Sequence, residues 1–311
     1  MSFAADVRAG LTTRPKMLLA KYFYDELGSA LFEAITKLPE YYLTRAESEI
    51  LARHADEMVD AIGVPIELIE LGSGSAVKTR YLIDAAFRRQ PALRYRPIDI
   101  SPSALEGAAA ALRKAYPKIV VDAHATDYLH GLQQLQRGNG HRALVLFLGS
   151  NVGNFDPVEA DATLRAVSGA LRPGDGFLLG ADLRKDPRVL EAAYDDPIGV
   201  TAAFNKNILL RINRELGGHF DVAAFDHRAV YNEEAGRVEM HLVSSRPQRV
   251  RIDGLDLEIA FDQGESIHTE SSYKYDAAQI ETLARATGFE VKRRWLDSNG
   301  AFSSNLLVAR T

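Results

Sequence analysis

A chain of 311 residues with 46% hydrophobic and 25% charged residues has the composition of a globular protein, long enough for one large domain with a substantial elaboration. It contains no cysteine, which excludes disulfides, thiolate metal sites and a cysteine nucleophile, and no stretch approaches the roughly 20 apolar residues of a membrane span. The formal charge of -5 disfavours nucleic acid as a partner, because a protein that binds nucleic acid must neutralise its phosphates with basic residues.

The N-terminal part, residues 1–61, is predicted to be mostly helical. Residues 1–16 mix charged and apolar side chains and lack the apolar core of a secretory signal, so we expect a cytoplasmic protein. Tyr41 and Tyr42 follow one predicted helix and precede another. Adjacent tyrosines of this kind are usually half-buried packing residues.

The next segment, residues 62–185, alternates short apolar runs with helical periods. The apolar runs are rich in β-branched residues, which is typical of strands buried on both faces; they span residues 66–71, 93–100, 119–123, 143–148 and 176–181. Helices are predicted over residues 78–89, 103–115 and 157–171, with Ser101 and Asp156 as N-caps. This alternation predicts a doubly wound α/β fold with a parallel sheet, which binds ligands at the carboxyl ends of its strands.

Beyond residue 185 the pattern changes. Residues 195–216 are predicted to form a helix, and residues 229–261 alternate in the manner of antiparallel hairpins. Segment 276–311 would complete the main sheet. It is predicted to contain a helix over 277–287 and strands over 290–296 and 306–309. Residues 186–275 are therefore predicted to be an insertion that packs with the N-terminal helices as a lid.

The first predicted strand ends in Glu70-Leu71-Gly72-Ser73-Gly74, directly before a helix. Glycines at this position let the backbone approach a ligand without a Cβ clash. Two other interpretations stay open. The segment is also compatible with a simple tight turn, or with a dinucleotide-binding loop, although the third glycine of that loop is replaced by Val77 or its neighbours.

Acidic residues follow the next two strands. Asp99 is placed to accept both ribose hydroxyls, and Asp127 to accept from an adenine amino group with Tyr128 nearby to stack. This set suits an adenosine without phosphates. Both acids are alternatively helix caps, and for Asp127 the two interpretations are nearly balanced. Lys78 is expected either beside a carboxylate of the cofactor or on a solvated helix face.

Two further positions are candidates for the substrate side of the site. Asn154, in the loop Gly149-Ser150-Asn151-Val152-Gly153-Asn154 after the fourth strand, carries an amide that both donates and accepts, and so suits an amino group and a carboxylate. Its alternative is a turn residue. Glu270 lies in a polar run inside a predicted strand and is alternatively one exposed member of an alternating face.

Several long motifs together resemble one family, the bacterial histidine Nα-methyltransferases of ergothioneine biosynthesis. The likeness runs nearly end to end. The motifs, in chain order, are LPEYYLTRAE from Leu38, ELGSGSAVKTR from Glu70, FLGSNVGNF from Phe147, AYDDPIGVTAAFNKNILLRINREL from Ala193, EMHL from Glu239 and TESSYKY from Thr269. Asn151-Val152, Ser271 and Tyr273 depart from the family pattern and bear on fine substrate tuning.

The resemblance implies a class I methyltransferase domain with a Rossmann-like doubly wound sheet and an α+β substrate-binding domain. It implies that Tyr41, Asn154 and Tyr194 hold the amino and carboxylate ends of histidine and that Tyr24 approaches the amino group. Glu270 and Ser272 would bind the imidazole, and Met240 would line its pocket. The implied cofactor is S-adenosyl-L-methionine, held by Gly72, Ser73, Gly74, Lys78, Asp99, Asp127 and Tyr128.

The implied reaction is successive methylation of the α-amino group of L-histidine to its trimethylated betaine, hercynine, with Asn154 and Tyr41 at the reacting amine. Because the sulfonium methyl is already activated, no metal is expected, and neither nucleic acid nor membrane is an expected partner. The oligomeric state stays open, with a monomer plausible. Three alternatives remain: a methyltransferase for another aromatic amino acid or amine such as tryptophan, a non-catalytic S-adenosylmethionine-binding module, and an NAD-dependent oxidoreductase.

Overall fold

The computed structural model describes residues 2–134 and 140–310. The chain forms two compact units, each built from segments that are far apart in the sequence. Unit 1 comprises residues 1–42 and 185–273, and unit 2 comprises residues 43–184 and 274–311. Within the described ranges, no helix has both the length and the apolar character needed to cross a membrane.

Unit 2 is organised around an eight-stranded sheet with the strand order β13-β14-β7-β6-β2-β3-β4, in which β5 also pairs with β3. Strands β2 to β7 run parallel to one another, whereas β14 is antiparallel to both β7 and β13. The strands are β2 (Ile66–Leu71), β3 (Leu93–Asp99), β4 (Ile119–Val121), β5 (His124–Ala125), β6 (Arg142–Phe147), β7 (Gly176–Asp182), β13 (Phe289–Leu296) and β14 (Phe302–Ala309). The predicted doubly wound α/β class is confirmed.

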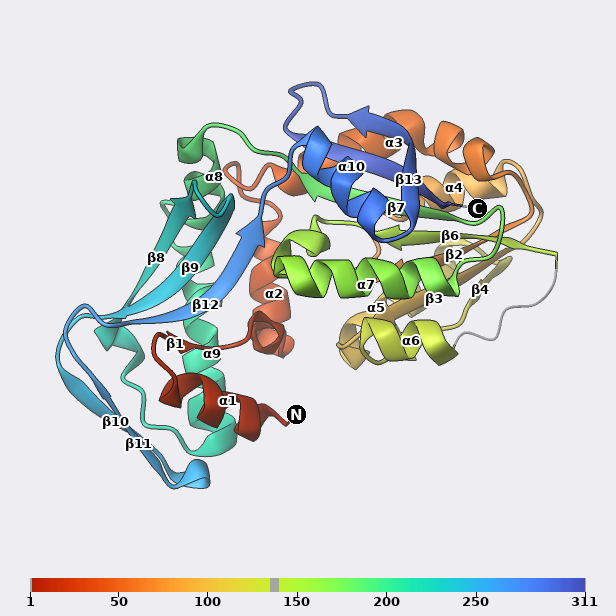
Figure 1. Ribbon diagram of the computed structural model, residues 1–311. Coiled ribbons are helices and arrows are strands. Elements are labelled where there is room, and N and C mark those ends of the chain that lie inside the picture. Colours follow the sequence, from red (N-terminus) through yellow and green to blue (C-terminus); the bar gives the residue numbers. More distant parts are fainter. Residues whose placement is uncertain (1, 135–139, 311) are drawn as a thin grey trace. The chain divides into compact units, whose positions relative to one another are not determined.

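Helices cover both faces of this sheet (Figure 1). They are α3 (Leu43–Ile62), α4 (Arg80–Phe87), α5 (Pro102–Ala115), α6 (Tyr128–Gln134), α7 (Pro157–Ala170) and α10 (Ala277–Ala286), with a 3-10 turn, η2 (Asn151–Asn154). On one face α6, α7 and α10 bury a continuous apolar cluster with Ile69, Val145 and Phe177. The predicted caps are confirmed, since Ser101 accepts from the backbone of Ala104, and Asp156 forms a capping box with Glu159.

Unit 1 contains a four-stranded sheet with the order β1-β12-β9-β8 and a separate hairpin, β10-β11. Helices α8 and α9 pack against β8 and β9. The elements are α1 (Phe3–Thr12), β1 (Lys16–Met17), η1 (Ala20–Phe23), α2 (Glu26–Ile35), α8 (Pro187–Tyr194), α9 (Val200–Leu216), η3 (Val222–Ala224), β8 (Phe225–Asn232), β9 (Arg237–Ser244), β10 (Gln248–Ile252), η4 (Asp253–Leu255), β11 (Leu257–Phe261) and β12 (Ser266–Tyr273). The antiparallel hairpins expected from the sequence are present.

Two expectations about boundaries differ from the structure. The sequence assigns residues 1–61 to the substrate-binding part, but α3 belongs to unit 2 because it packs against α4 and β14. The single helix expected over residues 195–216 is wrong at its start. Asp195 and Asp196 separate α8 from α9, and Gly199 has a left-handed φ of 80° before α9 begins.

Candidate functional site

The glycine turn after β2 lies at the carboxyl edge of the unit 2 sheet. Gly72 has a left-handed φ of 73°, and a Cβ added to it would lie 2.7 Å from Nδ2 of Asn151 and 2.8 Å from the hydroxyl of Tyr128. The turn therefore needs glycine both for its backbone conformation and for the side chains that close around it. The ring of Tyr128 packs edge-on against Phe147, with centroids 5.5 Å apart.

Glu70, the first residue of this motif, is buried beneath the turn. Its carboxylate oxygens lie 2.7 and 2.8 Å from the hydroxyl of Thr79, and the hydroxyl of Tyr95 also donates to it. Burial raises the pKa of Glu70 to about 7, although both hydroxyl donors favour the ionised form. Glu70 thus joins β2, β3 and the start of α4, and supports the turn from below.

We expect Glu70→Gln to flatten the dependence of stability on pH. Because the folded-state pKa of Glu70 lies above its ordinary value of 4.5, the folded protein loses stability as the pH rises from about 4.5 to about 7. The loss is on the order of 3 kcal/mol, from about 1.4 kcal/mol per pKa unit. Urea unfolding at several pH values would measure it. A variant whose free energy of unfolding falls as steeply as that of the unchanged protein would contradict the assignment.

The two acids expected at the cofactor have different surroundings. The carboxylate of Asp99 accepts the backbone N–H groups of Gly74 and Ser101, both at 2.9 Å, so it is held at the end of β3 beside the glycine turn. Each oxygen has a further lone pair for a ribose hydroxyl. Asp127 is exposed and accepts the backbone N–H of His130 at 3.0 Å, which caps α6 and lowers the pKa of this carboxyl.

Lys78 forms an ion pair with Glu47, a fully buried residue of α3. The carboxylate of Glu47 also accepts the backbone N–H of Gly149 at 2.8 Å, and thus ties the loop after β6 to the start of α4. A Cβ on Gly180 would lie 2.2 Å from the carboxylate of Glu47, so this glycine of β7 makes room for it. The glycine turn itself contains a buried hydroxyl, that of Ser73, with no hydrogen-bond partner in the described ranges.

These features fit an adenosyl ligand with an amino-acid tail. Asp99 offers acceptors for the ribose, Ser73 offers an unused buried hydroxyl, and Lys78 offers a cation at the same edge of the sheet. The next loop along this edge ends in Asn154, an exposed residue at the end of η2. Ser150, at the start of that loop, has a left-handed φ of 59° and accepts the backbone N–H of Asp182 at 2.9 Å.

In unit 1, the pairing of β9 with β12 brings three of the expected substrate residues together. Glu270 pairs with Met240, and Ser272 pairs with Val238. Met240, Glu270 and Ser272 are at most 9% exposed and share the face on which α8 packs. That face therefore presents a carboxylate, a hydroxyl and a thioether side by side, which suits a flat polar ring.

The expected tyrosines gather in the same unit. The hydroxyl of Tyr194, at the end of α8, lies 2.7 Å from the hydroxyl of Ser272. The rings of Tyr41 and Tyr194 meet edge-on with centroids 6.3 Å apart. The ring of Tyr24 contacts the rings of Phe32 and Phe204, which also contact each other. Phe32 in turn contacts the ring of Tyr41, so Tyr24 belongs to the same aromatic cluster. Six of the seven expected substrate residues thus lie in unit 1, and Asn154 lies in unit 2.

His227 is a supporting residue that the sequence analysis missed. Its Nε2 lies 2.8 Å from the backbone oxygen of Tyr194, and its Nδ1 lies 2.8 Å from the amide nitrogen of Asn205. These partners require a neutral ring that donates from Nε2 and accepts at Nδ1, and burial lowers the pKa of His227 accordingly. His227 thereby fixes the backbone at Tyr194.

Glu47 was also missed, although the sequence holds a sign of it. Glu47 lies four residues after Leu43 and four before Leu51, so it shares the apolar face of its helix. A carboxylate in that position needs a buried partner, and here the partners are Lys78 and Gly149. The identity of such partners follows only from the tertiary structure.

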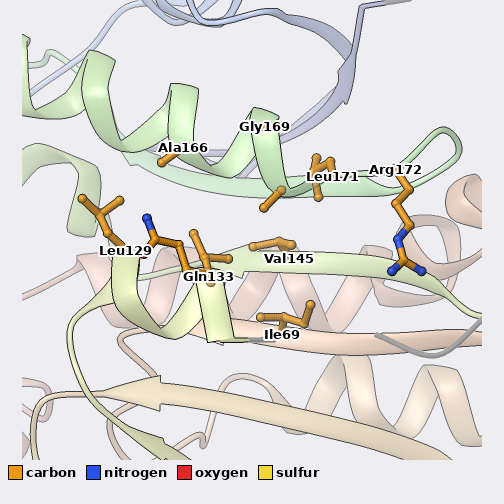
Figure 2. A pocket seen from close by; sticks show the side chains of 10 residues that line it. Ile69, Leu129, Gln133, Val145, Ala166, Gly169, Leu171 and Arg172 are labelled. Atoms are coloured by element: carbon orange, nitrogen blue, oxygen red, sulfur yellow. The ribbon is translucent and has the colours of Figure 1, made fainter. Parts of the chain in front are cut away.

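A cavity of about 380 Å³ lies between α6 and α7, over Ile69 of β2 and Val145 of β6 (Figure 2). Its lining is mainly apolar, with Gln133 and Arg172 as polar members, and none of the expected cofactor or substrate residues belongs to it. We therefore assign it no role. Among residues 2–134 and 140–310, no group of three or more histidine, cysteine, aspartate or glutamate side chains is arranged to hold a metal ion.

Comparison with known proteins identifies the relatives of this chain. The model of a family described as histidine-specific, S-adenosylmethionine-dependent methyltransferases matches residues 3–309. The chain is 44% identical over 306 residues to the histidine N-alpha-methyltransferase of Mycobacterium tuberculosis, covering 98% of this chain and 94% of that protein. The histidine N-alpha-methyltransferase of Mycolicibacterium smegmatis is 43% identical, with 97% and 94% covered.

More distant relatives agree with this grouping. Ergothioneine biosynthesis protein 1 of Neurospora crassa is 33% identical over 92% of this chain, which corresponds to 32% of that longer protein. Among solved structures, an S-adenosylmethionine-dependent methyltransferase from Clostridium acetobutylicum superimposes with a TM-score of 0.50 at 12% identity, covering 90% of this chain and 98% of that one. At this identity the likeness concerns the fold alone.

Proposed function

This chain belongs to the histidine-specific, S-adenosylmethionine-dependent methyltransferase family, and we propose that it methylates the α-amino group of L-histidine in successive steps to the trimethylated betaine, hercynine. The reaction would be a step of ergothioneine biosynthesis, the process named in its fungal relative. The observation that carries the proposal is the shared face of Met240, Glu270 and Ser272, with Tyr194 bonded to Ser272, in a chain of this family.

In this proposal unit 2 binds the cofactor. Bound S-adenosylmethionine supplies a methyl group already activated by its sulfonium, so the proposal includes no metal. Asp99 would accept the ribose hydroxyls while the N–H groups of Gly74 and Ser101 hold its carboxylate in place. Lys78, kept at this edge by Glu47, would offer its charge to the carboxylate of the methionine tail. Gly72 and Ser73 would line the base of the cofactor site, and Asp127 and Tyr128 would face the adenine.

The amino acid would be recognised mainly by unit 1. The carboxylate of Glu270 would accept an imidazole N–H, and the hydroxyl of Ser272 would bond to the ring as well. Met240 would pack on the ring face. A buried acceptor of this kind rejects amino acids that leave it unpaired, so it selects histidine over an apolar aromatic side chain.

The backbone end of the substrate would be held by Tyr41, Tyr194 and Asn154, with Tyr24 near the amine. Orientation of a neutral amine toward the methyl group is the main catalytic task, and alignment alone corresponds to effective molarities on the order of 10^5 M or more. The amide of Asn154 can bind the amine but cannot take up its proton, because an amide is not a base at neutral pH. A tyrosine hydroxyl or water would carry that proton to solvent.

The proposal predicts a stepwise mass increase of histidine. Purified protein incubated with S-adenosylmethionine and histidine should yield products one, two and three methyl groups heavier, followed by mass spectrometry. Tryptophan, tyrosine and phenylalanine assayed in parallel should react far more slowly. Turnover of tryptophan in preference to histidine would favour the alternative substrate class, and cofactor binding without turnover of any amino acid would refute an enzymatic role.

A further inference from the structure

Strand β12 contains an irregularity at the centre of the proposed substrate face. His268 pairs with His241 of β9, and Glu270 pairs with the adjacent residue Met240, so Thr269 is an extra residue in the ladder. This is a β-bulge, in which two residues on one strand oppose one residue on its partner. Bulges re-aim side chains and are frequent next to functional sites.

The bulge determines which face Glu270 occupies. In a regular strand, His268 and Glu270 would point to the same side, because side chains alternate. Here their partners His241 and Met240 are neighbours in β9 and therefore point to opposite sides. Consistently, the rings of His268 and His241 meet with centroids 5.4 Å apart, and Nε2 of His268 lies 3.0 Å from the hydroxyl of Ser271. Glu270 is turned to the other face, with Met240.

Thr269 itself fastens the bulge. Its side chain is buried, and its hydroxyl donates to the backbone oxygen of Met240 at 3.0 Å. The bond joins Thr269, the extra residue, to Met240, which pairs with Glu270. A bulge interrupts the regular ladder, so a side-chain donor at this point replaces part of the lost backbone pairing and limits the freedom of the strand.

We infer that Thr269 is a positioning residue for substrate specificity, whose hydroxyl holds the bulge that aims the Glu270 carboxylate toward the substrate ring. This inference rests on the proposed function, in which Glu270 binds the imidazole. Thr269 does not touch the substrate in this account; it acts through Glu270. Its removal should therefore affect recognition of the ring more than transfer of the methyl group.

The test compares Thr269→Val and Thr269→Ser. Valine has nearly the shape of threonine but no donor, whereas serine keeps the hydroxyl. We expect Thr269→Val to raise the KM for histidine about tenfold with kcat and the dissociation constant for S-adenosylmethionine little changed, because a buried carbonyl loses its donor. Thr269→Ser should restore most of the affinity. Thr287→Val, which removes a buried hydroxyl that donates to the backbone oxygen of Leu283 at the end of α10, is the matched control and should leave the KM unchanged.

The outcomes separate this inference from the function on which it rests. If the unchanged protein does not methylate histidine, the proposed function fails and the inference fails with it. If the unchanged protein is active but Thr269→Val keeps its KM, or loses kcat and cofactor affinity to the same degree, only the positioning role is overturned. Should the valine variant fail to fold, Thr269→Ala removes the same hydroxyl without adding a methyl group and carries the same expectation.

Discussion

Replacing Glu270 with alanine is expected to weaken histidine binding about 100-fold while leaving the affinity for S-adenosylmethionine nearly intact. Glu270 is 9% exposed, and in our proposal its carboxylate accepts the imidazole N–H. Loss of a buried hydrogen bond to a charged group corresponds to roughly 2 to 3 kcal/mol, which is about two factors of ten in a dissociation constant. Calorimetric titration with histidine in the presence of S-adenosylhomocysteine would measure it.

The matched control is Glu239→Ala. Glu239 lies one residue from Met240 on β9, on the opposite face of the same sheet, where it pairs with Arg237. Its loss removes a glutamate of the same sheet without touching the proposed substrate face. An equal loss of histidine and cofactor affinity in Glu270→Ala, or an equal effect of the two variants on histidine, would show that Glu270 has a structural role only.

The largest effect on stability is expected from Lys274→Met. Lys274 and Asp182 form an ion pair at 2.9 Å, and both side chains are fully buried. Asp182 ends β7, and its backbone oxygen accepts the N–H of Tyr275 at 3.0 Å, so the pair ties the segment that leaves unit 2 to the segment that returns. Removing one partner leaves an uncompensated buried charge, which costs about 3 to 5 kcal/mol. Urea unfolding would measure the change.

Two further variants test that explanation. The double variant Asp182→Asn with Lys274→Met removes both charges, and we expect it to recover most of the lost stability. Arg165→Met breaks an exposed pair with Asp161 in α7 and should change stability far less, because solvent screens such pairs. A double variant no more stable than Lys274→Met alone would show that the loss comes from packing instead of charge.

Much of unit 2 could be predicted from the sequence because its elements are local patterns. The strands are apolar runs, the helices have apolar residues at regular spacing, and Ser101 and Asp156 lie where helices begin. The long motifs then pointed to the family, and the family match is confirmed. The roles of the individual site residues stay predictions.

The remaining features depend on residues that meet only in the folded chain. The sequence does not reveal that Glu47 pairs with Lys78, because 31 residues separate them. It does not reveal the bulge at Thr269, since register is set by pairing with β9. The assignment of α3 to unit 2 follows similarly from packing against β14, whose residues lie at the other end of the chain.

The most direct test of the central claim locates the transferred methyl group. Histidine incubated with the protein and S-adenosylmethionine carrying an isotope-labelled methyl group would be analysed by NMR. We expect the label on the α-nitrogen alone, accumulating as one, two and then three methyl groups, while both imidazole nitrogens stay unlabelled. Label on a ring nitrogen, or no label on histidine at all, would contradict the account.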